Sequence, residues 1–322
     1  MSTNRIEIIV PCYNESQCIS KLESVIRDVF REKLVKYDWD ILFIDDGSSD
    51  DTLAEIKKLS ELYGEEIRYI SFARNFGKEA AIYAGLENST GDYVALMDAD
   101  LQHPPELLIE MVEALESGEY DCAAARRVSR NGEPPIRSAF SHAFYHVINW
   151  ATGMHLVPGM TDYRLMTRKV VDAIILLREH ERFIKGIYSW VGFRTKWIKY
   201  ENVERAAGES KWSLTGLWDY AKSGIIAFAV TPLRGVIWLG MIVVVLSLLY
   251  GITVIHSAVT GVRPWVDTTT IILLMLFLGG VTITILGVIG EYLARIYMEV
   301  KDRPIYVERE SNIHDDDKYA GD

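Results

Sequence analysis

The sequence predicts an α/β domain with a mainly parallel sheet, followed by a hairpin of two membrane-spanning helices. Three observations lead to this prediction. Short apolar runs alternate with helical patterns over residues 1–125, polar motifs directly follow three of these runs, and two long uncharged segments lie after residue 234. Strands that alternate with helices indicate βαβ units, and such units build parallel sheets.

Five short apolar runs are expected to be strands. They are residues 6–10, 40–44, 67–72, 93–97 and 121–125. Residues 52–63 should form a helix between the second and third strands, with N-cap candidates at Ser49, Asp50 and Asp51. In parallel sheets, ligands bind beyond the carboxyl ends of the strands, and the motifs PCYNE, DDGSSDD and DADLQ lie there in the sequence.

The pattern is looser from residue 126 to residue 210. Asn131, Gly132 and two prolines at 134–135 predict a loop. Residues 136–152 then have the pattern of an amphipathic helix. This helix either packs on the sheet or faces an acceptor substrate.

Segments 235–255 and 268–290 contain no charged residue. As a helix, each would span roughly 30 Å, which is about the thickness of the hydrocarbon layer of a membrane. The alternative is a pair of helices buried in a soluble core, but uncharged runs of this length are unusual there. The sequence therefore predicts a transmembrane hairpin over 234–291.

Basic residues flank the outer ends of the hairpin, whereas the linker 256–267 carries only Arg263. The positive-inside rule then places both chain termini in the cytoplasm, at the inner face of the cell membrane. Residues 212–229 have the pattern of an interfacial helix that lies on the membrane. The expected layout is a cytosolic domain over 1–210, the interfacial helix within 211–233, the hairpin over 234–291 and a cytosolic tail over 292–322.

Composition excludes some classes of protein. The chain has 322 residues and a net charge of −11. Nucleic-acid binding is not expected, because it requires a broad basic face. The three cysteines, Cys12, Cys18 and Cys122, lack metal-ligand spacing and suit a reduced cytosolic domain. Residues 1–10 lack the basic and then apolar layout of a signal peptide.

Asp98 and Asp100 directly follow the fourth apolar run. If the extended backbone continues, Asp98, Asp100 and the amide oxygen of Gln102 point to one side. Hard oxygen ligands at one point suit Mg²⁺ or Mn²⁺, which also neutralises a diphosphate leaving group. The alternative is an acidic turn that caps the next helix, with Pro104 and Pro105 in its first turn.

Two further motifs have residues suited to a nucleotide. Tyr13 could stack on a base, and Glu15 could meet a ribose hydroxyl or lie at a helix N-terminus. One carboxylate of Asp45 and Asp46 could accept hydrogen bonds from a base or a ribose. Neither motif is decisive by itself.

Six motifs occur in order along the chain: PCYNE, DDGSSDD, ARNFGKEAA, MDADLQHPPE, TDYRLMTR and AGESKW. Together they resemble the family 2 glycosyltransferases, which have the GT-A fold. Within that family they resemble the polyprenyl-phosphate hexose transferases, namely the bactoprenol-phosphate glucosyltransferases and the related dolichol-phosphate mannose synthases. The resemblance covers residues 5–212, and the C-terminal hairpin is similar to that of the bacterial glucosyltransferases.

The resemblance implies roles for the matching positions. Nucleotide-sugar contacts are implied for Pro11, Tyr13, Glu15, Asp46, Asp98 and Ala99. Contacts with Mg²⁺ or Mn²⁺, and through it with the diphosphate, are implied for Asp98, Asp100 and Gln102. Phosphate or acceptor contacts are implied for Arg126, Arg137 and Lys211.

Arg205 joins these basic residues, because an acidic protein with two anionic substrates needs cations at its site. The alternative for all four is a solvated surface charge. Some relatives have Gly-Ser where this chain has Ala124 and Ala125. This departure leaves open which of Arg126 and Arg127 points inward.

Asp162, in TDYRLM, is the implied catalytic carboxylate, together with Asp100. A phosphate monoester is close to dianionic near neutral pH, since its second pKa is about 6. Such an acceptor needs little general-base help, so Asp162 either takes a proton or orients the acceptor or the sugar. The alternative is a helix cap ahead of residues 165–177.

The implied reaction is the inverting transfer of a hexose from a UDP-sugar to undecaprenyl phosphate at the cytoplasmic membrane face, for modification of cell-envelope glycans. UDP-glucose is the expected donor, although UDP-GlcNAc, UDP-galactose or GDP-mannose fits the same motifs. A processive polysaccharide synthase would carry a Q-x-x-R-W motif, which this sequence lacks. The remaining alternative is a non-catalytic membrane scaffold that binds nucleotide sugars. The resemblance also implies a homotetramer, with the tail 300–310 exchanging contacts between subunits.

Overall fold

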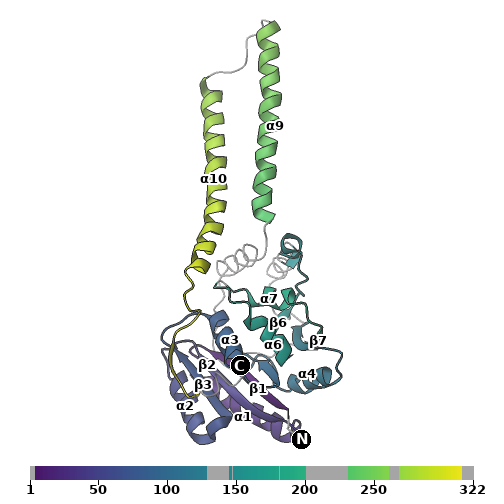
Figure 1. Cartoon of the computed structure of the whole chain (residues 1–322), viewed down its shortest axis with the longest axis vertical. Helices are drawn as coiled ribbons and strands as arrows, with labels where there is room; N and C mark the ends of the chain where they lie inside the picture. The colour runs from purple at the N-terminus through teal and green to yellow at the C-terminus, as the bar shows by residue number, and fades with distance from the viewer. Residues whose placement is uncertain are drawn as a thin grey trace. The chain divides into compact units, whose positions relative to one another are not determined.

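The computed structural model describes residues 4–128, 145–146, 148–180, 182–200, 231–260 and 268–313. These residues form two compact units. The first contains the described residues up to 221 together with those from 304 on, and the second contains the described residues of 222–303 (Figure 1). The tail beyond the second apolar helix thus belongs to the same unit as the N-terminal part of the chain.

Among the described residues, the first unit has one eight-stranded sheet. Its strands are β1 (Arg5–Cys12), β2 (Asp38–Asp45), β3 (Ile67–Phe72), β4 (Tyr93–Leu96), β5 (Cys122–Arg127), β6 (Met160–Thr167), β7 (Thr195–Tyr200) and β8 (Glu308–Ser311). Their order is β7-β5-β6-β4-β1-β2-β3-β8. The central strands β4, β1, β2 and β3 are parallel, whereas β6 and β8 run antiparallel to their neighbours. The predicted mainly parallel α/β sheet is confirmed.

Helices cover both faces of this sheet (Figure 1). In the described part of the first unit they are α1 (Ser16–Glu32), α2 (Thr52–Tyr63), the short 3₁₀ helix η1 (Gly64–Glu66), α3 (Lys78–Glu87), α4 (Leu107–Glu116), α6 (Arg168–Ile175) and α7 (Ile184–Trp190). The apolar sides of α1, α2 and α4 form one core cluster with the sheet. α3 and α6 contact each other and pack on the opposite face.

Successive side chains of β1 point alternately to the two faces of the sheet. Ile8 and Val10 belong to the core cluster shared with α1. Ile9 faces the other way, toward α3, and Gly85 of α3 lies so close that an added Cβ atom would approach Ile9 Cγ2 to 2.3 Å. A residue without a side chain therefore lets α3 pack directly on the strand that leads into the candidate site.

Three strands were not expected from the sequence. β6 and β7 interleave charged and apolar residues, and β8 lies in the expected tail. The helix expected over 165–177 is shorter than predicted, because β6 takes its first part and α6 begins at Arg168. Residues 148–152, within the helix expected over 136–152, are helical. The interfacial helix expected over 212–229 lies outside the described residues.

A buried ion network ties the amino-terminal halves of the central strands together. The Arg68 guanidinium on β3 lies 2.5 Å from Glu7 Oε1 on β1 and 2.8 Å from Asp40 Oδ2 on β2. Glu7 Oε2 also accepts the backbone N–H groups of Thr90 and Gly91, ahead of β4. One guanidinium thus joins three parallel strands in a fixed register.

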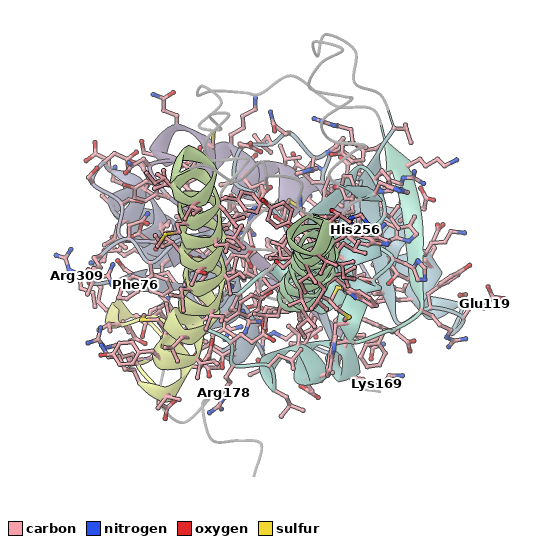
Figure 2. All side chains as sticks on the ribbon, turned by 90° about the horizontal axis from the view of Figure 1, so that it is seen from above. Phe76, Glu119, Lys169, Arg178, His256 and Arg309 are labelled. Carbon is pink, nitrogen blue, oxygen red and sulfur yellow. The ribbon has the colours of Figure 1, made fainter. Side chains whose placement is uncertain are left out.

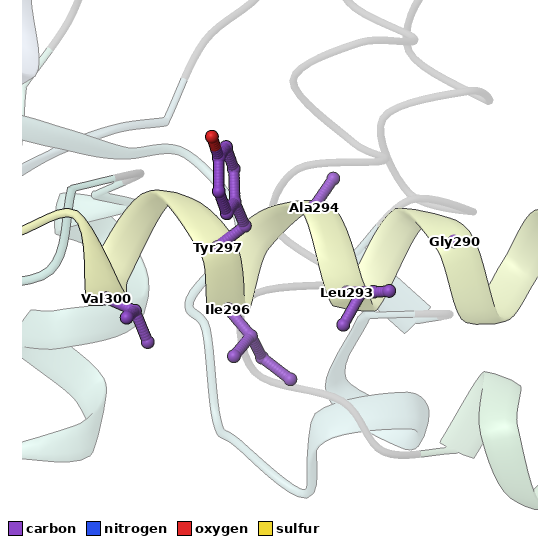
Figure 3. A pocket seen from close by; sticks show the side chains of 6 residues that line it. All are labelled: Gly290, Leu293, Ala294, Ile296, Tyr297 and Val300. Carbon is purple, nitrogen blue, oxygen red and sulfur yellow. The ribbon is translucent and has the colours of Figure 1, made fainter.

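The second unit contains α9 (Thr231–Thr260) and α10 (Thr268–Val300). Their apolar windows, Gly235–Thr253 and Leu274–Val300, are long enough to cross a membrane and are not buried within the protein. So much exposed apolar surface contradicts the alternative of two helices inside a soluble core. An open apolar hollow lies near the end of α10 (Figure 3). Its lining residues are Gly290, Leu293, Ala294, Ile296, Tyr297 and Val300.

Replacing Arg68 by Met should leave the buried Glu7 carboxylate uncompensated, whereas Asp40 keeps its 2.7 Å ion pair with Arg5. Breaking a buried ion network by removing one partner costs about 3–5 kcal/mol. Arg68→Met should lower the free energy of unfolding by that amount in chemical denaturation of the detergent-solubilised full chain, followed by tryptophan fluorescence. Lys58→Met is the control, because Lys58 pairs with Glu55 on the exposed surface of α2 and its loss should change little. Equal effects of the two substitutions would contradict this role of the network.

Candidate active site

The carboxyl ends of β1, β2 and β4 lie at one edge of the sheet, because the three strands are parallel. β5 ends at the same edge, since β4 and β5 both pair antiparallel with β6. The PCYNE, DDGSSDD and DADLQ segments therefore meet there, as the rule for parallel sheets predicts. β6 runs in the opposite direction, so its first residues, Asp162 among them, also lie at this edge.

The segment after β4 turns instead of continuing as a strand. β4 ends at Leu96, residues 99–100 form a turn, and Leu101 has a φ of 57°. Asp100 Oδ1 accepts the backbone N–H of Gln102 at 3.1 Å, which closes the turn. The segment is thus an acidic turn ahead of α4.

This turn corrects the expectation that an extended backbone carries three donor oxygens to one side. The reason lies at Ala99, whose side chain is 3% exposed and belongs to the core cluster. The turn buries this methyl group while Asp98 and Asp100 stay partly exposed. A nucleotide-sugar contact at Ala99 would consequently involve its backbone.

Asp162 lies on β6 beside the end of β4. The register pairs Leu96, the last residue of β4, with Arg164, so Asp98 follows β4 at the end of the strand next to which Asp162 lies. The alternative of a helix cap at Asp162 is wrong, because this residue is inside a strand and α6 begins only at Arg168.

Lys78 joins these two carboxylates. Its Nζ lies 2.6 Å from Asp98 Oδ1 and 2.8 Å from Asp162 Oδ2. Lys78 is the first residue of α3, and Gly77 before it has a φ of 97°, a conformation that suits glycine. The motif ARNFGKEAA was recognised without a role for this lysine. No local pattern relates this lysine to one carboxylate just after β4 and another on β6.

The surrounding charges keep Asp162 ionised. Burial by itself raises the pKa of this carboxyl, but Lys78, Lys185 and Arg164 outweigh burial and hold the pKa well below its ordinary value. Asp162 Oδ1 is buried and accepts no hydrogen bond from the described residues. Such a group is a poor proton acceptor, but its remaining oxygen can accept a hydrogen bond from a substrate hydroxyl.

Glu79 is a second acid close to this centre. Burial and, after it, the negative charge of Asp162 raise its pKa to about 8. The backbone N–H of Ile184 donates to Glu79 Oε2 at 2.9 Å, which connects α7 to α3. Glu79 is therefore mostly protonated at neutral pH, next to a carboxylate that is ionised.

The loops after β1 and β2 are fastened to each other. Asn14 has a φ of 55°, its Oδ1 accepts the backbone N–H of Ser49, and its own N–H donates to Ser48 Oγ, both at 2.9 Å. Tyr13 beside it is 37% exposed, which is enough for a base to stack on its ring. Glu15 occupies the N-cap position of α1, one of the two places expected for it.

The Asp46 carboxylate holds the loop that follows β3. It accepts the backbone N–H of Phe76 at 2.6 Å and that of Gly77 at 2.9 Å, and burial raises its pKa to about 6. Gly47 has a φ of 66°, and an added Cβ atom would lie 2.4 Å from the carbonyl carbon of Arg74. The two loops therefore pack backbone against backbone. A nucleoside at Asp46 would meet a carboxylate that already accepts two backbone hydrogen bonds from the loop after β3.

Two smaller expectations concern the same edge. Asp51 occupies the N-cap position of α2 without a side-chain capping bond. Instead, Asp50 Oδ1 accepts the backbone N–H of Thr52 at 3.0 Å. Pro11 is partly buried near the end of β1.

Arg126 is the one basic candidate that lies within the described residues. Its Nε donates to the carbonyl oxygen of Pro158 at 3.0 Å. In the register of β5 and β6, Arg126 lies opposite Met160. Met160 and Asp162 are two positions apart on β6 and point to the same face of the sheet, so Arg126, rather than Arg127, points to that face. The other three expected phosphate ligands, Arg137, Arg205 and Lys211, lie outside the described residues.

The donor set at the turn fits a divalent metal ion by its chemistry. Asp98, Asp100 and Gln102 supply carboxylate and amide oxygens, which Mg²⁺ and Mn²⁺ prefer. Within the described ranges, no three His, Cys, Asp or Glu side chains converge on one point. A metal ion here would therefore need further oxygens, of the kind that a diphosphate provides.

Two family models match the chain. Glycosyl transferase family 2 matches residues 7–175, and the GtrB C-terminal hairpin matches residues 231–296. The chain is 43% identical to the putative glycosyltransferase CsbB of Bacillus subtilis, over 98% of this chain and 95% of that protein. It is 37% identical to the SfII prophage-derived bactoprenol glucosyl transferase of Shigella flexneri, over 96% and 98% of the two chains.

Solved structures are also similar to the chain. One is glucosyl-3-phosphoglycerate synthase from Mycobacterium tuberculosis, in complex with Mn²⁺, UDP-glucose and phosphoglyceric acid. Its TM-score is 0.47 at 18% sequence identity, and the match covers 69% of this chain and 78% of that one.

Glu79→Gln tests the partly buried acid through the pH dependence of stability. The Glu79 carboxyl has a pKa of about 8 in the folded protein against an ordinary value of 4.5, so the folded state binds the proton more tightly. Stability should therefore fall as the pH rises from about 4.5 to about 8. Glu79→Gln cannot ionise and should flatten this fall in melting temperatures of the detergent-solubilised protein.

Lys78, Asp162 and Arg182 also influence Glu79, so the informative quantity is the difference between variant and wild type at each pH. Glu110→Gln, on the exposed side of α4, is the control and should follow the wild type. Parallel curves for wild type and Glu79→Gln across this range would show that Glu79 titrates at its ordinary pKa.

Proposed function

The chain belongs to glycosyl transferase family 2, and we propose that it transfers a hexose from a nucleotide sugar to the phosphate of a polyprenyl lipid. The two exposed apolar helices and the matching hairpin region fit a membrane-associated transferase. Support for the lipid acceptor comes from relatives that are named bactoprenol glucosyl transferases and align with nearly the whole chain.

One observation carries this proposal. Lys78 holds Asp98, at the turn suited to a diphosphate, together with Asp162 on the neighbouring antiparallel strand. Donor-side and acceptor-side groups thus belong to one charged centre at the carboxyl edge of the sheet. Group transfer requires both reactants at one point, because their orientation supplies a large part of the rate.

In the proposed donor complex, the nucleoside lies against the loops after β1 and β2. Tyr13 stacks on the base, Pro11 and Glu15 contact the nucleoside, and Asp46 holds the loop that borders it. This placement is supported by the exposed ring of Tyr13 and by the hydrogen bonds that make the two loops rigid.

The diphosphate lies at the turn that contains Asp98, Asp100 and Gln102, with Arg126 of β5 nearby. Mg²⁺ or Mn²⁺ held by these oxygens would neutralise the nucleoside diphosphate as it leaves. Arg137, Arg205 and Lys211 are proposed to bind the donor and acceptor phosphates as well.

The acceptor phosphate oxygen forms the new bond to the anomeric carbon while the bond to the nucleoside diphosphate breaks on the opposite face. The configuration at that carbon is consequently inverted. A phosphate monoester is largely dianionic near neutral pH, so no proton has to be removed from it. Asp162, kept ionised by Lys78, orients the sugar by accepting a hydrogen bond from one of its hydroxyl groups.

We propose UDP-glucose as the donor, because several relatives are named glucosyl transferases. The basic residues that flank the two helices favour a catalytic domain and both termini on the cytoplasmic side of the cell membrane. The proposed layout of the chain is the one expected from the sequence: a cytosolic domain, an interfacial helix within 211–233, the hairpin and a cytosolic tail. A homotetramer is proposed from the family resemblance.

Asp100→Asn tests the proposal while keeping the size of the side chain. The full-length protein is placed in liposomes that contain undecaprenyl phosphate and receives radiolabelled UDP-glucose with Mg²⁺ or Mn²⁺. The wild type should form a labelled lipid. The variant should lose about 10²–10³-fold in rate, since it weakens the oxygen ligand set for the metal ion that would neutralise the departing diphosphate. Asp28→Asn, an exposed carboxylate on α1, should transfer at the wild-type rate.

The same assay separates the alternatives. UDP-GlcNAc, UDP-galactose and GDP-mannose, supplied in turn, identify the sugar that is transferred. Donor binding without any lipid product would favour a nucleotide-sugar-binding scaffold. Metal-dependent transfer by Asp100→Asn at the wild-type rate would contradict the site assignment.

A further inference from the structure

The C-terminal tail adds a strand to the sheet that carries the candidate site. β8 pairs antiparallel with β3, and the pairing extends past the strand, since the backbone N–H of Ala73 donates to the Val307 carbonyl oxygen at 2.9 Å. In Figure 2, the labels of Phe76 and Arg309 mark the loop after β3 and the tail on the same side of the domain. The tail therefore contacts loop 73–77, which connects β3 to α3.

Tyr306 connects the tail to this loop through two aromatic contacts. Its ring stacks on Phe72, with a centroid distance of 4.9 Å and an interplanar angle of 21°. Phe72 in turn meets Phe76 edge-on, with a centroid distance of 5.8 Å. Tyr306 Oη donates to Glu87 Oε2 and accepts from Asn88 Nδ2, both at 3.0 Å. Tyr306 thus contacts the last residue of β3, ahead of the loop, and two residues at the end of α3.

Loop 73–77 carries groups on which the proposed donor site depends. The N–H groups of Phe76 and Gly77 donate to Asp46, and the loop leads directly into Lys78. A displacement of this loop would therefore move the lysine that joins the two carboxylates. It would also release the carboxylate that borders the proposed nucleoside.

We propose that Tyr306 is a positioning residue of the donor site. Acting through Phe72 and Phe76, it holds loop 73–77 in the conformation that places Lys78 and engages Asp46. This inference rests on the proposed function, since it concerns the binding of a nucleotide sugar. The segment that follows α10 along the chain would then complete the donor site as well as the sheet.

Hydrogen exchange of the full-length protein tests this inference without reference to transfer. The amides of Phe76 and Gly77 are protected by Asp46, so a peptide that covers 73–79 should exchange slowly in the wild type. Tyr306→Ala should speed its exchange, whereas Tyr306→Phe should not, because the stacking ring remains. Lys57→Met removes the 2.5 Å ion pair between α2 and Glu310 of the tail, away from this loop, and should leave the peptide unchanged.

Donor kinetics provide a second readout. Tyr306→Ala should raise the KM for the nucleotide sugar by roughly tenfold, with a smaller change in kcat, while Tyr306→Phe and Lys57→Met stay near the wild type. If Tyr306→Ala does not fold, Tyr306→Leu, which keeps the bulk without the ring, takes its place.

Unchanged exchange over 73–79 together with an unchanged donor KM would overturn the inference. A lower yield or melting temperature with the KM unchanged would also overturn it, because it would reveal a purely structural contact. Absence of transfer by the wild type with every donor would count against the proposed function instead. The exchange experiment would still decide whether Tyr306 holds the loop.

Discussion

The candidate site depends on one ammonium group held between two carboxylates. Lys78 contacts Asp98, just after β4, and Asp162, on the neighbouring antiparallel strand β6. Two ionised carboxylates at this range repel each other, and a cation between them replaces the repulsion with two attractions. The lysine therefore allows both acids to stay ionised at one edge of the sheet.

Much of the surrounding structure determines where this lysine lies. Gly85 lets α3 pack directly on β1, and Gly77 supplies the left-handed conformation with which the helix is entered. Asp46 binds the loop ahead of the helix from one side, and Tyr306 of the tail supports it from the other. At the opposite end of the strands, the buried Arg68 network keeps the register of the sheet. Elements that are far apart in the sequence thus together determine where the Lys78 side chain lies.

Features that depend on a local pattern could be predicted from the sequence. The βαβ alternation, the polar segments after the strands and the two uncharged helices are all visible within short windows, and the structure has them. The local pattern left two conformations open after β4, an extended backbone or an acidic turn, because the choice depends on burying Ala99 in a core formed by distant residues. Lys78 was overlooked for a related reason, since it lies 84 positions from Asp162 and only the fold brings them together. The strand β8 likewise depends on pairing with β3 from the far end of the chain.

The transfer rate of Lys78→Met measures the central claim most directly. The variant and a Lys58→Met control, in which an exposed lysine of α2 is replaced, are reconstituted in liposomes with the lipid phosphate and the nucleotide sugar. Lys78→Met should transfer about 10²–10³-fold more slowly than the control while keeping a similar melting temperature. Transfer by a folded Lys78→Met protein at the rate of the control would contradict the account, because the two carboxylates would then act without the cation between them.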